Sequence, residues 1–237
     1  MMLLVPLGLL AGALTTVAGL GGGMFLVLAL SVAWDPLTAL TVTAPALLLG
    51  NTHRALLYRA HVDRRVALPL VLGALPGSIA GGLLAARLPS VALHALMVGM
   101  TLVAVARAAG WMSWRPPRGA IGPAGFGIGA LAATSGGAGL LAGPLLMTAG
   151  LTGEAYVSTA AAGAVAMHLG RIVAYGATGL FDSGNLARSA LLAGAILAGN
   201  LVGARARKWL PATATPRIEL TALGACVLLS LAGLLPS

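Results

Sequence analysis

Apolar residues fill eight long stretches of the chain, and the connections between them are short and carry charges, prolines or glycines. The stretches cover approximately residues 3–33, 36–58, 66–86, 90–109, 120–149, 154–180, 186–204 and 218–235. A helix of about 20 residues crosses the hydrocarbon core of a bilayer, so each stretch is about long enough for one crossing. The pattern predicts an all-α fold, a polytopic bundle of transmembrane helices.

The first and fifth stretches are longer than one crossing, and glycines interrupt both of them. These glycines are Gly19, Gly21, Gly22 and Gly23 in the first stretch and Gly136, Gly137 and Gly139 in the fifth. Close packing between transmembrane helices is one use of such small residues. Runs of glycine weaken a helix interior, however, so we favour two short helices joined at a break in each stretch.

The two halves of the chain resemble each other without a gap when the sequence is shifted by 117 residues. The shift superposes Gly12 on Gly129, Gly22 on Gly139, Arg54 on Arg171, Tyr58 on Tyr175 and Gly82 on Gly199. Some glycine matches arise by chance in so glycine-rich a chain, whereas the recurring Arg-x-x-x-Tyr pair is harder to dismiss. We infer an internal repeat, with a first transmembrane repeat over residues 1–110, a connecting loop over 111–119 and a second transmembrane repeat over 120–237.

The composition indicates a membrane protein and argues against other classes. Hydrophobic residues make up 59% of the 237 residues and charged residues only 8%, whereas soluble domains carry about 25% charged residues. The formal charge of +9 is spread between apolar stretches, which is typical of membrane orientation rather than of nucleic-acid binding. We therefore expect the surface to face a lipid bilayer, with no nucleic-acid partner.

The basic residues of the connections indicate how the stretches cross the membrane. If every stretch crosses once, the connections divide 7 basic residues against 5; if the two glycine-broken stretches are hairpins that enter and leave on one side, they divide 10 against 2. The positive-inside rule favours the second arrangement. Each half then has an odd number of crossings, so the halves have opposite orientations, as in the inverted repeats of many secondary transporters. The basic side would be cytoplasmic, with both termini outside.

Two arginines lie inside predicted transmembrane stretches. Arg171 lies about 17 residues into its stretch, where inserting a charge costs on the order of 3 kcal/mol or more. Arg54 is close enough to the end of its stretch to reach the interface by snorkelling. No acidic residue lies deep enough to neutralise either arginine. The natural counter-ion would be an anionic substrate.

The glycine breaks are expected to lie inside the protein, because non-helical backbone in a bilayer needs protein or water around it. A half-helix that starts at a break directs free N–H groups and the positive end of its dipole toward that place. We expect the substrate-binding residues to be Arg54 and Arg171 together with Gly21, Gly22, Gly23, Asn51, Thr134, Ser135, Gly136, Gly137, Gly139, His168 and Tyr175. For His168, an ordinary interhelical hydrogen bond and a proton-coupling role both stay open.

Signs of catalytic chemistry are missing from the sequence. It contains no nucleotide-binding loop, no metal-ligand cluster and no Ser/His/Asp constellation with plausible spacing, and Cys226 is its only cysteine. We therefore expect no cofactor, no metal ion and no enzyme activity.

Several local motifs follow one another in a distinctive order. They are Gly19-Leu20-Gly21-Gly22-Gly23, Leu57-Tyr58-Arg59, His61-Val62-Asp63-Arg64-Arg65, the glycines Gly73, Gly77 and Gly81, and the second cluster Gly136, Gly137 and Gly139 with Pro144. Through the order, spacing and duplication of these motifs, nearly the whole chain resembles the sulfite-exporter family called TauE/SafE. Residues 24–28 depart from it, because they lack the proline that family sequences often place after the first cluster.

The resemblance implies a secondary carrier in a bacterial inner membrane, for sulfite, thiosulfate, sulfonates or related small anions. Alternating access around a midplane site between the two broken hairpins is the mechanism that fits, with a proton or Na⁺ as a candidate coupling ion. An anion channel or uniporter of the same architecture and a structural membrane subunit without transport activity stay open as alternatives. Substrate identity, transport direction and oligomeric state, a homodimer included, also stay open.

Overall fold

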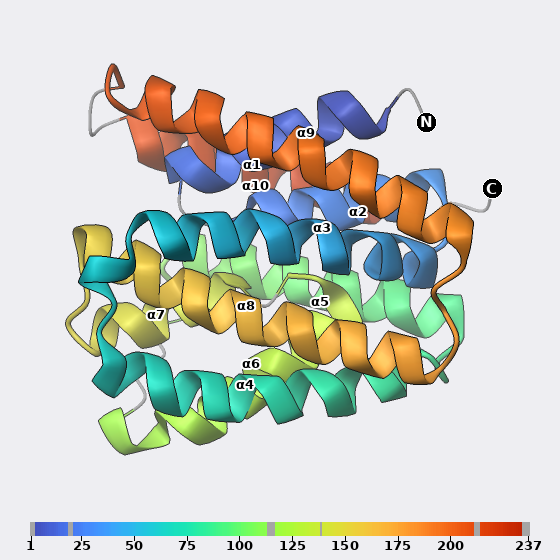
Figure 1. The fold of residues 1–237 in the computed structure, drawn as a ribbon, viewed down its shortest axis with the longest axis horizontal. Helices are drawn as coiled ribbons and strands as arrows, with labels where there is room; N and C mark the ends of the chain where they lie inside the picture. The colour runs from blue at the N-terminus through green and yellow to red at the C-terminus, as the bar shows by residue number, and fades with distance from the viewer. Residues whose placement is uncertain (1–2, 19–20, 113–116, 138, 211–213, 234–237) are drawn as a thin grey trace.

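The computed structural model describes residues 3–18, 21–112, 117–137, 139–210 and 214–233, and every regular element in these ranges is a helix (Figure 1). The prediction of an all-α fold is confirmed. Most helices run along the long axis of the molecule and lie side by side in one bundle (Figure 1).

The first half of the chain contains five α-helices. They are α1 (Leu4–Ala18), α2 (Gly22–Ala33), α3 (Pro36–Leu57), α4 (Arg64–Ala85) and α5 (Ser90–Ala108), with the short 3₁₀-helix η1 (Arg59–His61) between α3 and α4. The second half follows the 3₁₀-helix η2 (Arg118–Ala120) and has the same series. Its helices are α6 (Ile121–Ser135), α7 (Gly139–Thr148), α8 (Gly153–Ala177), α9 (Ser183–Arg207) and α10 (Ala214–Ala232).

The starts of the first three helices in each half follow the spacing of the sequence repeat. Residues 4 and 121, which begin α1 and α6, stand 117 residues apart, as do residues 22 and 139, which begin α2 and α7, and residues 36 and 153, which begin α3 and α8. The same local signals in each half therefore produce the same series of elements.

Three aspartates begin long helices. Asp35, Asp63 and Asp182 each precede a helix, and their carboxylates accept backbone N–H bonds from the first turns of α3, α4 and α9. Proline follows Asp35 at the first position of α3, where its missing N–H would have no partner in any case. Such caps stabilise helix starts by about 1 kcal/mol and occupy these carboxylates at the ends of the bundle.

Both glycine-interrupted stretches form two short helices, as predicted. Gly21 precedes α2 with a φ of 96°, and Gly136 ends α6 in the left-handed conformation with a φ of 70°. Residues other than glycine rarely adopt such positive φ values, so the glycines allow the backbone to turn at these two positions. Residues 19–20 and 138, which complete the two breaks, lie outside the described residues.

The two halves pack against each other through reciprocal helix pairs. In the first pair, a Cβ at Gly12 of α1 would collide with the backbone of α9 at Ile196; in the second, a Cβ at Gly77 of α4 would collide with the backbone of α6 at Phe126. Only glycine permits such close backbone approach. The first helix of each half thus packs along the fourth helix of the other half.

Equivalent helices of the two halves run in opposite directions. α3 (blue to teal) and α8 (yellow to orange) cross the bundle in opposite senses (Figure 1). α3 instead runs parallel to α9, since Val42 lies beside Ser189 and Gly50 beside Ile196. α8 runs parallel to α4, in the opposite direction, since Gly163 faces Leu70 and Gly170 faces Leu75.

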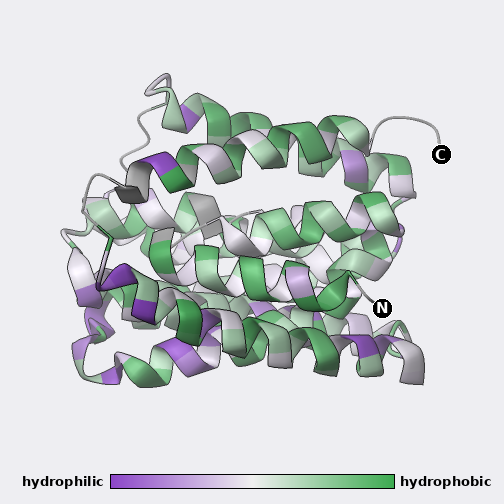
Figure 2. Cartoon of the chain, turned by 90° about the horizontal axis from the view of Figure 1, so that it is seen from above, coloured by the Kyte–Doolittle hydropathy of each residue, from purple (hydrophilic) through white to green (hydrophobic). Residues whose placement is uncertain are grey.

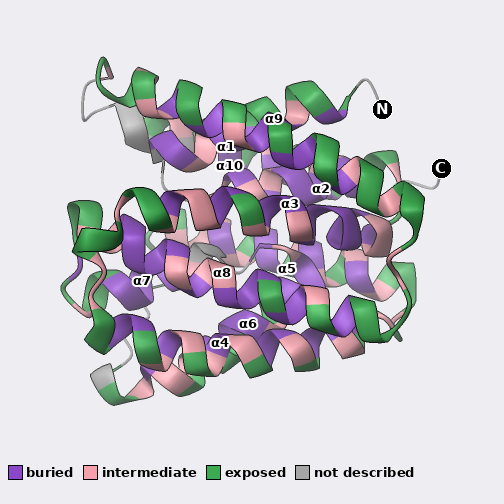
Figure 3. Cartoon of the chain, in the orientation of Figure 1, coloured by how far each residue is buried: buried purple, intermediate pink, exposed green. Residues whose placement is uncertain are grey.

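The outer surface of the bundle is apolar. Four helices, α4, α5, α8 and α9, are long and apolar enough to cross a membrane. The strongly hydrophilic residues lie mostly toward the ends of the bundle (Figure 2), while exposed positions follow the lengths of the outer helices (Figure 3). Large apolar side chains such as Leu68, Leu72 and Leu102 are exposed. A surface of this kind suits lipid as its solvent, and the chain is a polytopic membrane protein.

Basic residues gather at one end of the bundle. The α3–α4 connection, with Arg59, Arg64 and Arg65, lies at the same end as the close of α9, which carries Arg205 and Arg207 (Figure 1). These segments occupy different positions in the two halves. Their meeting at one end agrees with the hairpin arrangement that the charges favour.

Candidate functional site

A cavity of about 90 Å³ lies inside the bundle where the two glycine breaks approach α3 and α8. A single water molecule needs roughly 10–15 Å³, so this volume suits several waters or a small anion. Of the predicted site residues, the structure brings together Gly21, Gly23, Asn51, Arg54, Gly136, Gly137, His168 and Arg171 along its walls. Both halves of the chain therefore contribute to one cavity.

Arg171 is buried, with 1% of its surface exposed. One terminal nitrogen, Nη2, donates to the carbonyl oxygen of Leu40 at 2.5 Å and to the hydroxyl of Thr43 at 3.1 Å, both on α3. The other, Nη1, lies 3.3 Å from Nδ1 of His168, and the guanidinium carbon lies 5.9 Å from the centre of the Tyr175 ring. The third nitrogen, Nε, is buried and has no hydrogen-bond partner within the described part of the chain.

Arg54 is also buried, and its guanidinium bonds groups inside the bundle. Its Nη1 donates to the backbone carbonyl of Thr15 at 2.9 Å, and its Nη2 donates to Oδ1 of Asn51 at 2.9 Å. Thr15 lies in the last turn of α1, where carbonyls lack intrahelical partners, so the end of this half-helix draws the arginine inward. Nε of Arg54 again finds no partner among the described residues.

The two arginines form equivalent pairs in the two halves. Asn51 and Arg54 on α3 match His168 and Arg171 on α8 at the repeat spacing of 117 residues. Each arginine contacts the polar side chain three positions before it, a separation that places side chains on one helix face. The cavity thus has one arginine pair from each half.

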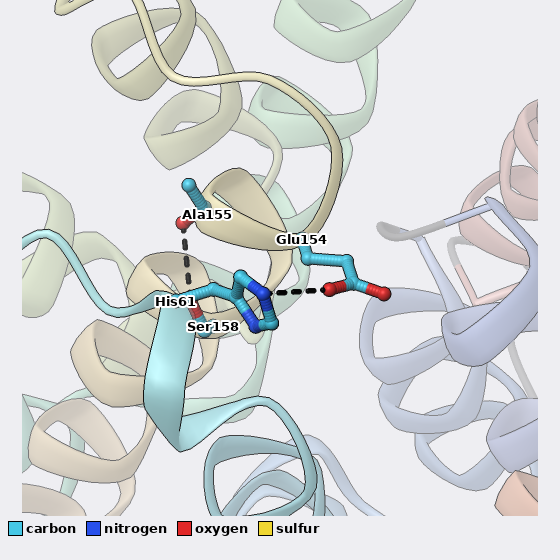
Figure 4. A network of polar contacts seen from close by, with 4 residues as sticks. All are labelled: His61, Glu154, Ala155 and Ser158. Carbon is cyan, nitrogen blue, oxygen red and sulfur yellow. Dashed lines mark hydrogen bonds and ion pairs between the residues drawn. The ribbon is translucent and has the colours of Figure 1, made fainter.

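The described acidic side chains leave both arginines without a carboxylate partner. Three of them cap helices, as given above, and Glu154 lies 3.1 Å from Nε2 of His61 at an exposed end of the bundle (Figure 4). The side chain of Glu219 is not among those that the structure describes. Buried unpaired charge is strongly unfavourable, so an anion in the cavity between the two guanidinium groups would be stabilised by both of them.

The first break adds further positive potential. α2 begins at Gly22, and Gly21 before it offers no side-chain cap, so the N–H groups of the first turn are not satisfied by a capping side chain. Gly23 and Met24 of this turn line the cavity. The positive end of the helix dipole therefore has the same sign as the two arginines.

The second break touches α2, the helix that follows the first break. A Cβ at Gly136 would lie 2.7 Å from the side chain of Val27, and a Cβ at Gly137 would lie 2.9 Å from the sulfur of Met24. Both contacted residues belong to α2. The two glycine breaks, far apart in the sequence, therefore meet at the cavity wall.

Four predicted residues do not line the cavity, namely Gly22, Thr134, Ser135 and Tyr175. Thr134 and Ser135 donate their hydroxyls to carbonyls one turn earlier in α6, a common use of these side chains in helices. A Cβ at Gly22 would meet α1, so this glycine serves hairpin packing. Tyr175 supports the site from behind, because its hydroxyl donates to the carbonyl of Ala133 at 2.6 Å. Gly139 begins α7, and its contacts lie outside the described part of the chain.

Three contacts at the site could not be predicted from residue types or from the repeat. The carbonyls of Thr15 and Leu40 accept bonds from the arginines, and a backbone oxygen carries no sequence signal. The hydroxyl of Thr43 also bonds Arg171, although the repeat spacing matches Thr43 with Ala160. A repeat comparison therefore would not select this threonine.

Comparison with known proteins gives a family. The family described as Sulfite exporter TauE/SafE matches residues 4–233, nearly the whole chain. No curated protein and no solved structure is significantly similar to the chain.

Proposed function

The chain belongs to the sulfite exporter TauE/SafE family, and we propose that it is a secondary transporter of a small sulfur-containing or organic anion of the sulfite, thiosulfate or sulfonate class. The family is one of membrane transporters. We place this member in a bacterial inner membrane, with alternating access around the cavity between the two breaks.

One observation carries the proposal: Arg54 and Arg171 are buried at the same cavity, and no described carboxylate faces them. Their buried Nε atoms have no partner among the described residues, so the protein does not satisfy either guanidinium completely. A planar guanidinium suits the oxygens of a sulfur oxyanion or a carboxylate. An anion in the cavity would supply the counter-charge that the protein lacks.

The arrangement of the halves supports alternating access. Equivalent helices run in opposite directions. Each of the close-packed pairs α1–α9 and α4–α6 joins one helix of the first half to one helix of the second half. Inverted repeats of this type place the substrate between discontinuous helices and move one repeat against the other. The cavity lies between the two discontinuous helices of this chain.

Ligand binding to the purified protein tests the proposal. Sulfite, sulfate, thiosulfate, sulfoacetate, taurine and acetate are added one at a time, and a substrate raises the unfolding temperature because it binds the native state. Arg171→Ala should remove the shift, whereas Arg87→Ala, the same substitution at an exposed position outside the cavity, should keep it. A parent protein that none of the six anions stabilises, or a full shift in Arg171→Ala, would contradict the proposal.

Exchange in proteoliposomes separates a carrier from a channel. A carrier preloaded with unlabelled anion takes up labelled anion faster than an empty vesicle, because each loaded return step brings a site back to the outside. An open channel gives no such acceleration, and a uniporter gives it without any dependence of uptake on pH or Na⁺. A protein that binds the anion but moves none of it would favour the role of a structural subunit.

A further inference from the structure

The repeat places a titratable residue on only one side of the cavity. Asn51 in the first half and His168 in the second occupy equivalent positions, three residues before their arginines. Asn51 accepts a hydrogen bond from Arg54 through its amide oxygen. An asparagine therefore suffices as the acceptor in this pair, and the histidine of the other pair adds one property that asparagine lacks, the capacity to bind a proton.

The contact between His168 and Arg171 depends on the protonation state of the imidazole. An arginine side chain has donors and no acceptor, so the approach of Nη1 to Nδ1 at 3.3 Å is a hydrogen bond only when Nδ1 carries no proton. Protonated His168 would lose this bond and place a third positive charge beside the cavity. The two arginines therefore favour neutral His168 as long as no anion balances their charge.

The groups around His168 make its protonation sensitive to an anion. Arg54 faces it from α3, and Arg171 and Tyr175 adjoin it on α8 itself. His53 on α3, Tyr58 at the end of α3 and Tyr156 on α8 do not line the cavity. The charged residues of α4 and η1, namely Arg59, His61, Arg64 and Arg65, are exposed at the basic end, and α6 and α7 contain no titratable residue. No described carboxylate lines the cavity to balance a proton.

We propose that His168 is the proton-binding site of this transporter and that it takes up a proton together with the anion. A bound oxyanion cancels positive charge around the imidazole, and a protonated imidazole in turn attracts the anion, so each ligand strengthens the binding of the other by the same factor. The proton enters from water on the side where the anion binds and leaves to water on the side where the anion is released. The inference rests on the proposed function and assigns its coupling ion.

Proton uptake on binding tests the assignment. Sulfite is titrated into the full-length protein by calorimetry in buffers with different heats of ionisation, which gives the number of protons taken up per anion. Sulfite itself can change protonation on binding, and comparison with His168→Asn removes that contribution, because asparagine is the residue that the first repeat already uses. The parent should take up about one proton more than His168→Asn near neutral pH. Relative to that variant, its affinity should fall about tenfold per pH unit once His168 is deprotonated in the free protein.

A second histidine supplies the matched control. His61→Asn changes a histidine that is about half exposed and lies far from the cavity at the basic end, and it should take up as many protons as the parent. His168→Gln provides a second neutral acceptor in case His168→Asn fails to fold.

Each outcome decides the matter. Equal proton uptake in the parent and in a His168 variant that still binds sulfite would overturn the assignment and leave the proposed function intact. Loss of sulfite binding in both folded His168 variants would make His168 a positioning residue for the anion and would also overturn it. A parent that binds no sulfite would remove the proposed function for this anion, and the proton site with it.

Discussion

Arg171→Met should separate binding of the anion from stability of the fold. Methionine is unbranched and apolar, so it keeps much of the length of the arginine and removes its charge. The change deletes the bonds of the guanidinium to Leu40, Thr43 and His168. The carbonyl of Leu40 keeps its place in the helical ladder, and the hydroxyl of Thr43 still donates to Ala39 at 2.8 Å.

The two consequences differ in size. Loss of the imidazole contact costs about 0.5–1.5 kcal/mol of folding free energy, and removal of a desolvated charge offsets this cost, so we expect stability within about 2 kcal/mol of the parent. A hydrogen bond from a charged donor to the anion contributes about 1.5–3 kcal/mol, which corresponds to a Kd raised roughly 10- to 150-fold.

Calorimetric titration with sulfite and thermal unfolding of the same samples measure both quantities. Arg171→Lys should recover part of the affinity, because an ammonium restores the charge without the planar fork. Arg87→Met at an exposed position is the control for loss of a positive charge. The reasoning fails if Arg171→Met binds sulfite like the parent while its unfolding temperature drops sharply, since the arginine would then be a structural element.

Three further predictions address the breaks and the topology. Gly23→Ala should fold like the parent, because its new Cβ makes only ordinary contact at 3.5 Å, and it should weaken sulfite binding because the methyl group fills part of the cavity. Gly22→Ala should lose at least about 1 kcal/mol of stability, because its Cβ collides with α1. Equal unfolding temperatures of the two variants would contradict this distinction. Single cysteines at Ala60 and Ala206, in a cysteine-free background, should react with a membrane-impermeant reagent from the same side, and labelling from opposite sides would end the hairpin topology. Tyr175→Phe should lower the free energy of unfolding by about 1 kcal/mol, since the carbonyl that it bonds at 2.6 Å is buried; an unchanged denaturation midpoint would show that the bond contributes nothing.

Features with a large local energy could be predicted from the sequence. Glycines disrupt a transmembrane helix and buried arginines are unfavourable in lipid, so the breaks and the depth of Arg171 follow from residue types and spacing. The inward direction of Arg54 depends on a free carbonyl at Thr15, and that carbonyl is free only because α1 ends inside the bundle. The different roles of Gly22, which packs against α1, and Gly23, which lines the cavity, likewise depend on which face of α2 meets α1.

The exchange of partners between the halves has a consequence for biosynthesis. α1 finds its close-packed neighbour, α9, only after most of the chain has been made, because Gly12 fits against the backbone near Ile196. Until then the glycine face of α1 has no close-packed partner in the membrane. The glycine face of α4 likewise has no partner until α6 has been made. The first half therefore cannot mature as a separate folding unit while the ribosome completes the second. Expressed alone, it would reach this packing only by assembling with another half, which is the assembly expected of an ancestor before the gene was duplicated.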